Sequence, residues 1–150
     1  MTSRRLSRVL STMVATAALG WGFAAQSVEL NGLEGMDGIF GRYAPGGDCS
    51  RQPQVIVDAT GLTFVVGGKQ EKVTNPEQAL GFLGPDYQGP DIWLFPFRLK
   101  DGYAILMTFN DGGQLGTMTI IPQDEGYPGG PKLGPRNQAL VGGSPYKRCK

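Results

Sequence analysis

The side chains that could do chemistry in this sequence are carboxylates and two cysteines, because the chain contains no histidine. Without histidine there is no Ser-His-Asp triad, no Cys-His nucleophile pair and no histidine zinc site. Two cysteines alone do not complete a tetrahedral structural zinc site either. We therefore expect no cofactor, and paired carboxylates remain as the main catalytic option.

Five acidic residues, at three places in the sequence, are candidates for such carboxylate chemistry. Asp58 precedes a Thr-Gly pair and is expected to lie in a hairpin turn. Asp124 and Glu125 are adjacent in a loop, which favours solvated charges over a cation or glycosidase site. Asp86 and Asp91 form the best acid pair, because carboxylates about 5–10 Å apart hydrolyse glycosides.

The most distinctive binding candidates are Trp93, Phe95 and Phe97. They alternate along one predicted strand, so their side chains are expected to point to the same face. Such a row suits a sugar ring, a lipid or a partner protein. It also suits a hydrophobic core, which the apolar neighbours Ile92 and Leu94 favour. We therefore expect Trp93 and Phe95 to be structural first and functional second.

A second candidate surface precedes the last cysteine. The tetrapeptide Gly143-Ser144-Pro145-Tyr146 resembles the inhibitory loop of the periplasmic lysozyme inhibitors, which bears a serine and a tyrosine. Those proteins are small exported β-barrels with a late cysteine, so the resemblance implies an inhibitory role for Ser144 and Tyr146. It covers four residues without a second motif, and it is an analogy of fold, not a family assignment.

Residues 1–25 have the pattern of a secretory signal peptide. Arg4, Arg5 and Arg8 form a basic start, and an uncharged, mostly apolar stretch follows over residues 9–25. The alternative, a retained membrane anchor, needs ~20 strongly apolar residues. This stretch is shorter and is diluted by Ser, Thr and Gly, so removal of the segment is predicted.

The mature chain is expected to be periplasmic or extracellular, without a membrane span. Removing residues 1–25 takes away three of the 14 basic residues and none of the 13 acidic ones, which leaves a net charge of −2. That balance argues against nucleic acid as a partner. Cleavage is predicted after one of three small residues, Ala24, Ala25 or Ser27.

Cys49 and Cys149 are predicted to form a disulfide, because paired thiols in an exported protein normally oxidise. Closing a loop of this length is worth about 4–5 kcal/mol in the chain-entropy model, less any strain. The alternatives are two free buried thiols or a catalytic thiol, and the missing histidine argues against the latter. The basic residues around Cys149 over 147–150 are typical of a solvated tail.

Apolar runs between glycine- and proline-rich turns predict one mostly β domain over 26–150. Seven or eight short strands, about 8–12 residues apart, favour a small antiparallel β-barrel or sandwich. A Pro/Gly-rich loop over 122–135 follows the strongest strands. The predicted strands cover residues 38–43, 54–58, 62–66, 69–73, 92–98, 103–109, 115–121 and 137–141.

One short helix is predicted over 75–83. Asn75 suits its N-cap, Pro76 suits its first turn, and Gly84 followed by Pro85 suits its end. Its apolar side would cover one face of the aromatic strand. Residues 26–37 are weakly patterned and predict an arm or a short turn of helix.

Together these patterns predict a non-catalytic envelope protein that binds an envelope protein or a cell-wall-related ligand. Inhibition of a cell-wall hydrolase is one form of that function. Two alternatives stay open. A cleft with two acids would favour a small carboxylate-dependent hydrolase, and a large exposed apolar patch would favour a structural envelope component. A flat or protruding loop beside the disulfide would favour binding.

Overall fold

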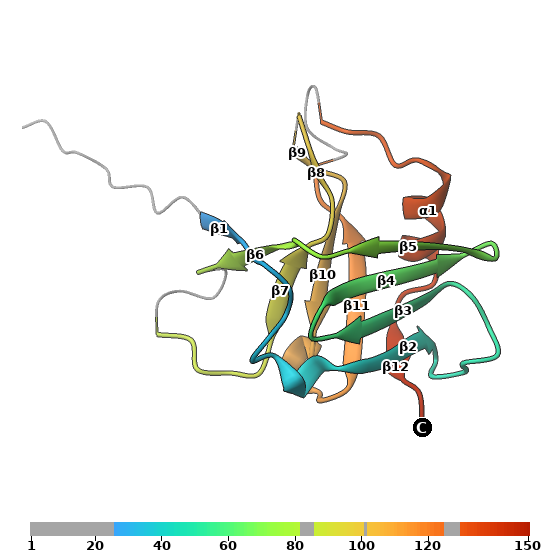
Figure 1. Cartoon of the computed structure of the whole chain (residues 1–150), viewed down its shortest axis with the longest axis horizontal. Helices are drawn as coiled ribbons and strands as arrows, with labels where there is room; N and C mark the ends of the chain where they lie inside the picture. The colour runs from blue at the N-terminus through green and yellow to red at the C-terminus, as the bar shows by residue number, and fades with distance from the viewer. Residues whose placement is uncertain (1–25, 82–85, 101, 125–129) are drawn as a thin grey trace, which may run out of the picture.

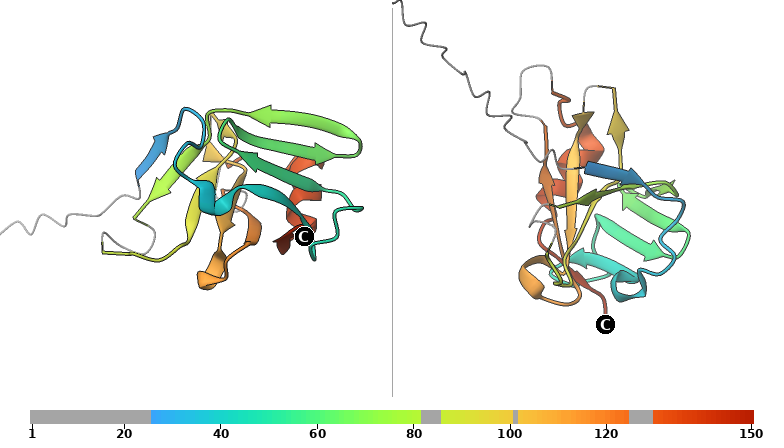
Figure 2. Two further views of the ribbon diagram at one scale, coloured as in Figure 1. Left: turned by 60° about the horizontal axis from the view of Figure 1, so that its bottom comes forward. Right: turned by 90° about the vertical axis from the view of Figure 1, so that its left-hand side faces the viewer.

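The computed structural model describes residues 26–81, 86–100, 102–124 and 130–150. Ten strands form one antiparallel sheet that curls into a half-barrel (Figures 1 and 2). In order across the sheet they are β1 (Gln26–Glu29), β6 (Glu77–Leu80), β7 (Ile92–Phe95), β10 (Ile105–Phe109), β11 (Thr117–Pro122), β12 (Tyr146–Arg148), β2 (Gly41–Pro45), β3 (Gln54–Asp58), β4 (Gly61–Val66) and β5 (Lys69–Val73).

Two more short strands, β8 (Arg98–Leu99) and β9 (Gly102–Tyr103), pair with each other apart from the main sheet. The prediction of a mostly β, antiparallel domain is confirmed. The described residues contain more strands than the seven or eight predicted. The predicted signal peptide, residues 1–25, lies outside the described residues.

The main core fills the inside of the curled sheet. Its largest fully buried side chains are Tyr43, Tyr146, Phe64 and Phe109, and the rings of Tyr43 and Phe109 meet edge to face with centroids 5.5 Å apart. These residues come from strands on both halves of the sheet, so burial of one core holds the halves together.

The C-terminal strand β12 lies between β11 and β2 and joins the two halves of the sheet. Lys147 pairs with Thr117 on one side and with Ala44 on the other, and Arg148 pairs with Tyr43. The prediction of a solvated tail over 147–150 is therefore wrong for the first two of these residues. Local charge alone gave no sign that this short segment pairs on both edges.

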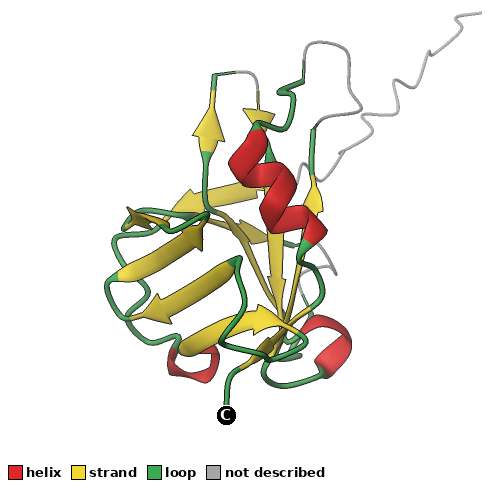
Figure 3. Ribbon diagram, turned by 90° about the vertical axis from the view of Figure 1, so that its right-hand side faces the viewer, coloured by secondary structure: helices red, strands yellow, loops and turns green. Residues whose placement is uncertain are grey.

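The helix α1 (Pro135–Gly142) packs against β4 and β11 at one end of the half-barrel (Figure 3). The predicted strand over 137–141 is therefore wrong. Asn137 and Leu140 are both buried, three residues apart, which is the spacing of one helical face. Pro135 at the first turn and Gly143 after the end are ordinary helix boundaries.

The predicted helix over 75–83 is also wrong. Residues 77–80 form β6, which pairs with β1 on one edge and β7 on the other. The side chain of Asn75 donates a hydrogen bond to Glu29 at 3.1 Å and caps no helix. Backbone pairing on both edges outweighs the local helix signal. Residues 82–83 lie outside the described residues.

The start of the domain differs from its prediction in detail. Residues 26–29 form β1, whereas an arm or a turn of helix was expected over 26–37. A 3-10 helix, η1 (Asp37–Ile39), occupies the start of the predicted first strand, and β2 begins at Gly41. The predicted hairpins that link β3, β4 and β5 are confirmed.

Candidate functional site

Cys49 and Cys149 form the predicted disulfide, with Cα atoms 5.9 Å apart. The bond links the loop after β2 to the residue after β12, and the backbone amide of Cys149 donates to the carbonyl of Arg42 at 2.7 Å. This disulfide is compatible with an oxidising, exported compartment. It also fixes the position of the residues around it.

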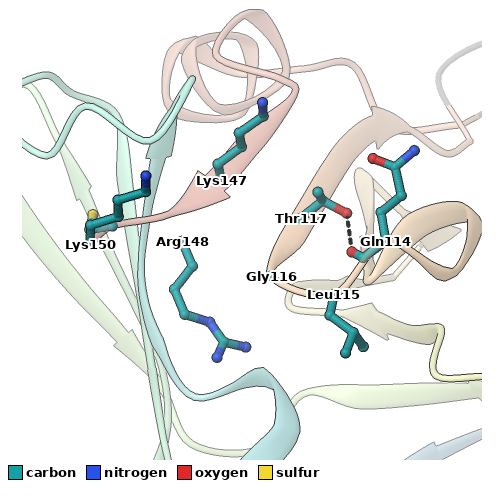
Figure 4. Close-up of a pocket in the computed structure, with 8 residues that line it drawn as sticks. Gln114, Leu115, Gly116, Thr117, Lys147, Arg148 and Lys150 are labelled. Atoms are coloured by element: carbon teal, nitrogen blue, oxygen red, sulfur yellow. Dashed lines mark hydrogen bonds between the residues drawn. The ribbon is translucent and has the colours of Figure 1, made fainter.

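An open depression of about 580 Å³ lies beside the disulfide (Figure 4). Two segments form its walls, residues 114–117 before and within β11 and residues 147–150 at the C-terminal end. Lys147, Arg148 and Lys150 carry positive charges there, and the lining contains no acidic residue. The depression therefore concentrates positive charge.

Neutral oxygens hold the guanidinium group of Arg148. Its Nε and Nη2 donate to the hydroxyl of Tyr43 at 3.3 and 3.1 Å, and Nη2 also donates to the carbonyl of Gly38 at 2.5 Å. Burial raises the pKa of Tyr43 and outweighs the opposing effect of Arg148, so the phenol stays neutral. Arg148 forms no ion pair with any described residue, and its Nη1 atom donates no hydrogen bond to any of them. Nη1 is therefore available to bind an anion.

The wall opposite Arg148 is a loop held by hydrogen bonds. Asn110 adopts the left-handed backbone conformation at φ 56°, and its side chain accepts from the amide of Gly116 and donates to the carbonyl of Pro90. The backbone amide of Asn110 donates to the carbonyl of Thr117 at 2.8 Å. This arrangement presents Leu115 to solvent with 76% of its surface exposed.

No family model, curated protein or solved structure matches this chain. Within the described ranges, no helix is long and apolar enough to cross a membrane. The same residues contain no group of three or more Asp, Glu or Cys side chains that could hold a metal ion. Function is therefore inferred from the geometry of the chain itself.

The structure places Trp93 and Phe95 in a second, smaller cluster, apart from the main core. Phe95 is 6% exposed and its ring stacks on Tyr103 with centroids 4.0 Å apart. Trp93 is half-buried and its ring lies 5.5 Å from that of Tyr87. The burial of Phe95 gives it a structural role.

Phe97 does not share a face with the other two aromatic residues. The strand β7 ends at Phe95, and beyond Pro96 the ring of Phe97 packs beside Phe64 of the main core, with centroids 5.0 Å apart. The guanidinium of Arg136 covers it at 3.6 Å. The predicted aromatic row is therefore wrong, because the strand is too short to carry its alternation to residue 97.

Ser144 and Tyr146 do not form an exposed loop surface. Tyr146 is fully buried, and its hydroxyl donates to the carbonyl of Leu140 at 2.6 Å. Burial raises the pKa of this hydroxyl well above its usual range. The side chain of Ser144 accepts a hydrogen bond from the amide of Ile120 at 2.9 Å. The structure removes Tyr146 from the candidate partner surface and gives Ser144 a structural bond.

The acids singled out in the sequence bind the backbone. Asp91 accepts from the amide of Gly113 at 3.1 Å, and Asp124 from that of Tyr103 at 2.7 Å. Asp58 accepts from the amide two residues later at 2.8 Å, which confirms its hairpin-turn role. Hydrogen bonds from that residue, Thr60, lower the pKa of Asp58.

Two acidic candidates remain. Asp86 is exposed, and Glu125 lies outside the described residues. The hydroxyl of Tyr87 also donates to the carboxylate of Asp91. Both carboxylate oxygens of Asp91 thus already accept hydrogen bonds, which disfavours a role for Asp91 in acid–base catalysis with Asp86.

Glu77, which the sequence reading missed, is the one buried charged side chain among the described residues. Its carboxylate accepts from the hydroxyl groups of Ser27 and Tyr103 and from Arg98 at 3.0 Å. Burial raises the pKa of Glu77, but these hydrogen bonds and the charge of Arg98 together outweigh burial and hold the pKa below its ordinary value. Glu77 therefore joins β1, β6, β8 and β9 as an ionised group.

Glu77→Gln is expected to lower the free energy of unfolding at neutral pH by about 1–3 kcal/mol, because buried hydrogen bonds lose their charged acceptor. The native pKa lies below the ordinary 4.5. This stabilisation is thus present above the unfolded-state pKa and is lost as the pH falls through the native pKa. Chemical unfolding across the acid range measures it, with the exposed Glu34→Gln as control. A difference that persists unchanged at the acid end would contradict this role.

Proposed function

We propose that the chain is an exported, non-catalytic binding protein. Its binding site is the C-terminal cationic surface, which we define as the walls of the depression, residues 114–117 and 147–150. The observation that carries this proposal is the Arg148 guanidinium, which lines an open depression and has only uncharged partners in the described part of the chain, two oxygens and the ring of Tyr43 at 5.6 Å. A charge-assisted hydrogen bond to an anionic group would satisfy its remaining donors.

Export is supported by two independent features. The first is the basic, then apolar, then small-residue pattern of residues 1–25. The second is the disulfide between Cys49 and Cys149, a type of bond that persists mainly in oxidising compartments. We place the mature protein in the periplasm or outside the cell, where its partner would be an envelope protein or a cell-wall-related ligand.

Binding is favoured over hydrolysis by the state of the acidic side chains. A second depression, of about 500 Å³, is lined by three carboxylates, Glu29, Glu71 and Glu77. Each already has a partner in Asn75, Arg136 or Arg98, respectively. Carboxylates held in this way support the structure, whereas the guanidinium of Arg148 on the cationic surface retains an N–H donor group that is unpaired among the described residues.

Arg148→Gln is expected to weaken binding of a simple anion about tenfold or more, because hydrogen bonds to a charged group contribute about 1.5–3 kcal/mol. Calorimetric titration of the mature, oxidised protein with inorganic phosphate, and separately with acetate, measures this and shows which anion is preferred. Lys132→Gln removes the same charge from an exposed position outside the depression. Equal losses in both variants, or no saturable binding, would refute the proposal.

A further inference from the structure

We infer that the C-terminal cationic surface receives an acidic protein partner, one that places an apolar side chain against Leu115 and a carboxylate against Arg148. This inference rests on the proposed function and names its ligand class. Leu115 and Arg148 lie on opposite walls of the same depression (Figure 4). A single contact segment of a partner can therefore reach both.

Leu115 is the most exposed of the large hydrophobic side chains described. A lone exposed leucine is ordinary on protein surfaces. This one differs because its loop is fixed at both ends and in the middle. The amide of Gly113 donates to Asp91, the hydroxyl of Thr117 donates to the carbonyl of Gln114 at 2.7 Å, and the amide of Arg148 donates to the carbonyl of Gly116 at 2.8 Å.

A rigid loop reduces the entropy lost on binding, because the apolar side chain is already displayed in one place. Asn110, whose side chain joins Gly116 of this loop to the carbonyl of Pro90 in another loop, is itself only 3% exposed. The loop is thus held from within the fold and needs no partner to become ordered. An exposed apolar side chain on such a loop is a suitable anchor for a protein interface.

The charges around Leu115 specify the sign of the partner. Lys147, Arg148 and Lys150 line the depression and no acidic residue is among its lining residues, although the mature chain as a whole has a net charge of −2. A partner with carboxylates around an apolar contact would therefore be steered to this surface and held in register. A basic or neutral partner would leave the guanidinium of Arg148 without a counter-charge.

The shape of the depression favours a protein over a small molecule. Small-ligand sites enclose most of their ligand within a cleft or cavity. Here two short segments form the walls and the remaining sides are open, so a small anion that binds Arg148 would leave Leu115 uncovered. A protein segment can cover Leu115 and the cations together and exclude water from both.

Selection of a random displayed peptide library on the mature, oxidised protein tests this inference. The expected peptides combine Asp or Glu with a large apolar residue. Leu115→Ser and Arg148→Gln should each weaken a selected peptide about tenfold or more. Leu99→Ser is the matched control, since Leu99 is also exposed and lies on β8 at the far end of the molecule from the C-terminal residue (Figure 1).

The outcomes separate this inference from the proposed function. Selected peptides that lack acidic residues, or that bind the Leu115→Ser variant with the same affinity as the parent protein, would overturn the protein-partner inference. If phosphate binds through Arg148 but no peptide is enriched, the surface takes a small anion only, and the proposed function stands alone. If neither probe binds, both fail. Thermal melting of each variant verifies that the fold is intact, which the exposure of Leu115 leads us to expect.

Discussion

Cys149→Ser is expected to lower the free energy of unfolding by about 2–5 kcal/mol, because the disulfide no longer restricts the unfolded chain. The bond joins positions 100 residues apart, and it holds β12 where that strand connects both halves of the sheet. Against a total stability of about 5–15 kcal/mol for a domain, this loss is large. Denaturant unfolding of the mature protein measures it.

The double variant Cys49→Ser with Cys149→Ser is the matched comparison. It removes the same bond without leaving a single thiol that could pair between molecules. Both variants should be destabilised to a similar degree, since each lacks the same cross-link. An unchanged melting temperature, or two thiols in the native protein that react with an alkylating reagent, would contradict the disulfide.

Phe95→Ala is expected to lower the free energy of unfolding by about 3–5 kcal/mol, because it leaves a cavity where a buried ring was packed. Phe95 stacks on Tyr103 and packs with Ala79 and Leu106 in the smaller cluster. That cluster covers the face of β6, β7 and β10 opposite the main core. Thermal and denaturant unfolding of the mature protein measure the loss.

Leu115→Ala provides the contrast to Phe95→Ala, because Leu115 is exposed and its truncation should change stability by less than about 0.5 kcal/mol. Phe95→Ala should still bind phosphate under conditions in which the variant is folded. If Phe95→Ala leaves stability unchanged and abolishes binding, then the aromatic strand and not the C-terminal surface is the ligand site.

The strongest strands were predictable because their signal is local. The hairpins that join β3, β4 and β5 follow alternating apolar residues separated by tight turns, and the structure has them in that order. β10 is buried along its whole length, and four of its five residues are apolar, with Thr108 as the exception. In these segments residue type, turn chemistry and burial all favour the same conformation.

The two largest errors in secondary structure have different physical origins. The sequence near Asn75 contains a good N-cap and a proline for a helix, but β1 and β7 pair with both edges of residues 77–80 and make them a strand. Residues 137–141 end in the short apolar run Ala139-Leu140-Val141, which was predicted as a strand, but only valine favours a strand, alanine and leucine favour a helix, and Pro135 suits the helix start. At residues 77–80 tertiary pairing overrode the local signal, whereas at 135–142 intrinsic preference and the flanking proline agree with the structure.

The candidate site was harder to predict than the fold. Arg148 is one of several basic residues near Cys149, and nothing in that short run shows that it faces a depression. Its role depends on Tyr43 and Gly38, more than 100 positions earlier in the chain. Conversely, a four-residue resemblance to an inhibitory loop placed Tyr146 on a candidate partner surface, yet Tyr146 is fully buried.

An amide chemical-shift map of the mature, oxidised protein titrated with inorganic phosphate locates the binding site directly. We expect saturable shifts confined to residues 114–117 and 147–150, the two walls of the depression, and their loss in Arg148→Gln. Shifts centred on β7 or on the depression lined by Glu29, Glu71 and Glu77, or shifts that Arg148→Gln retains, would contradict this expectation.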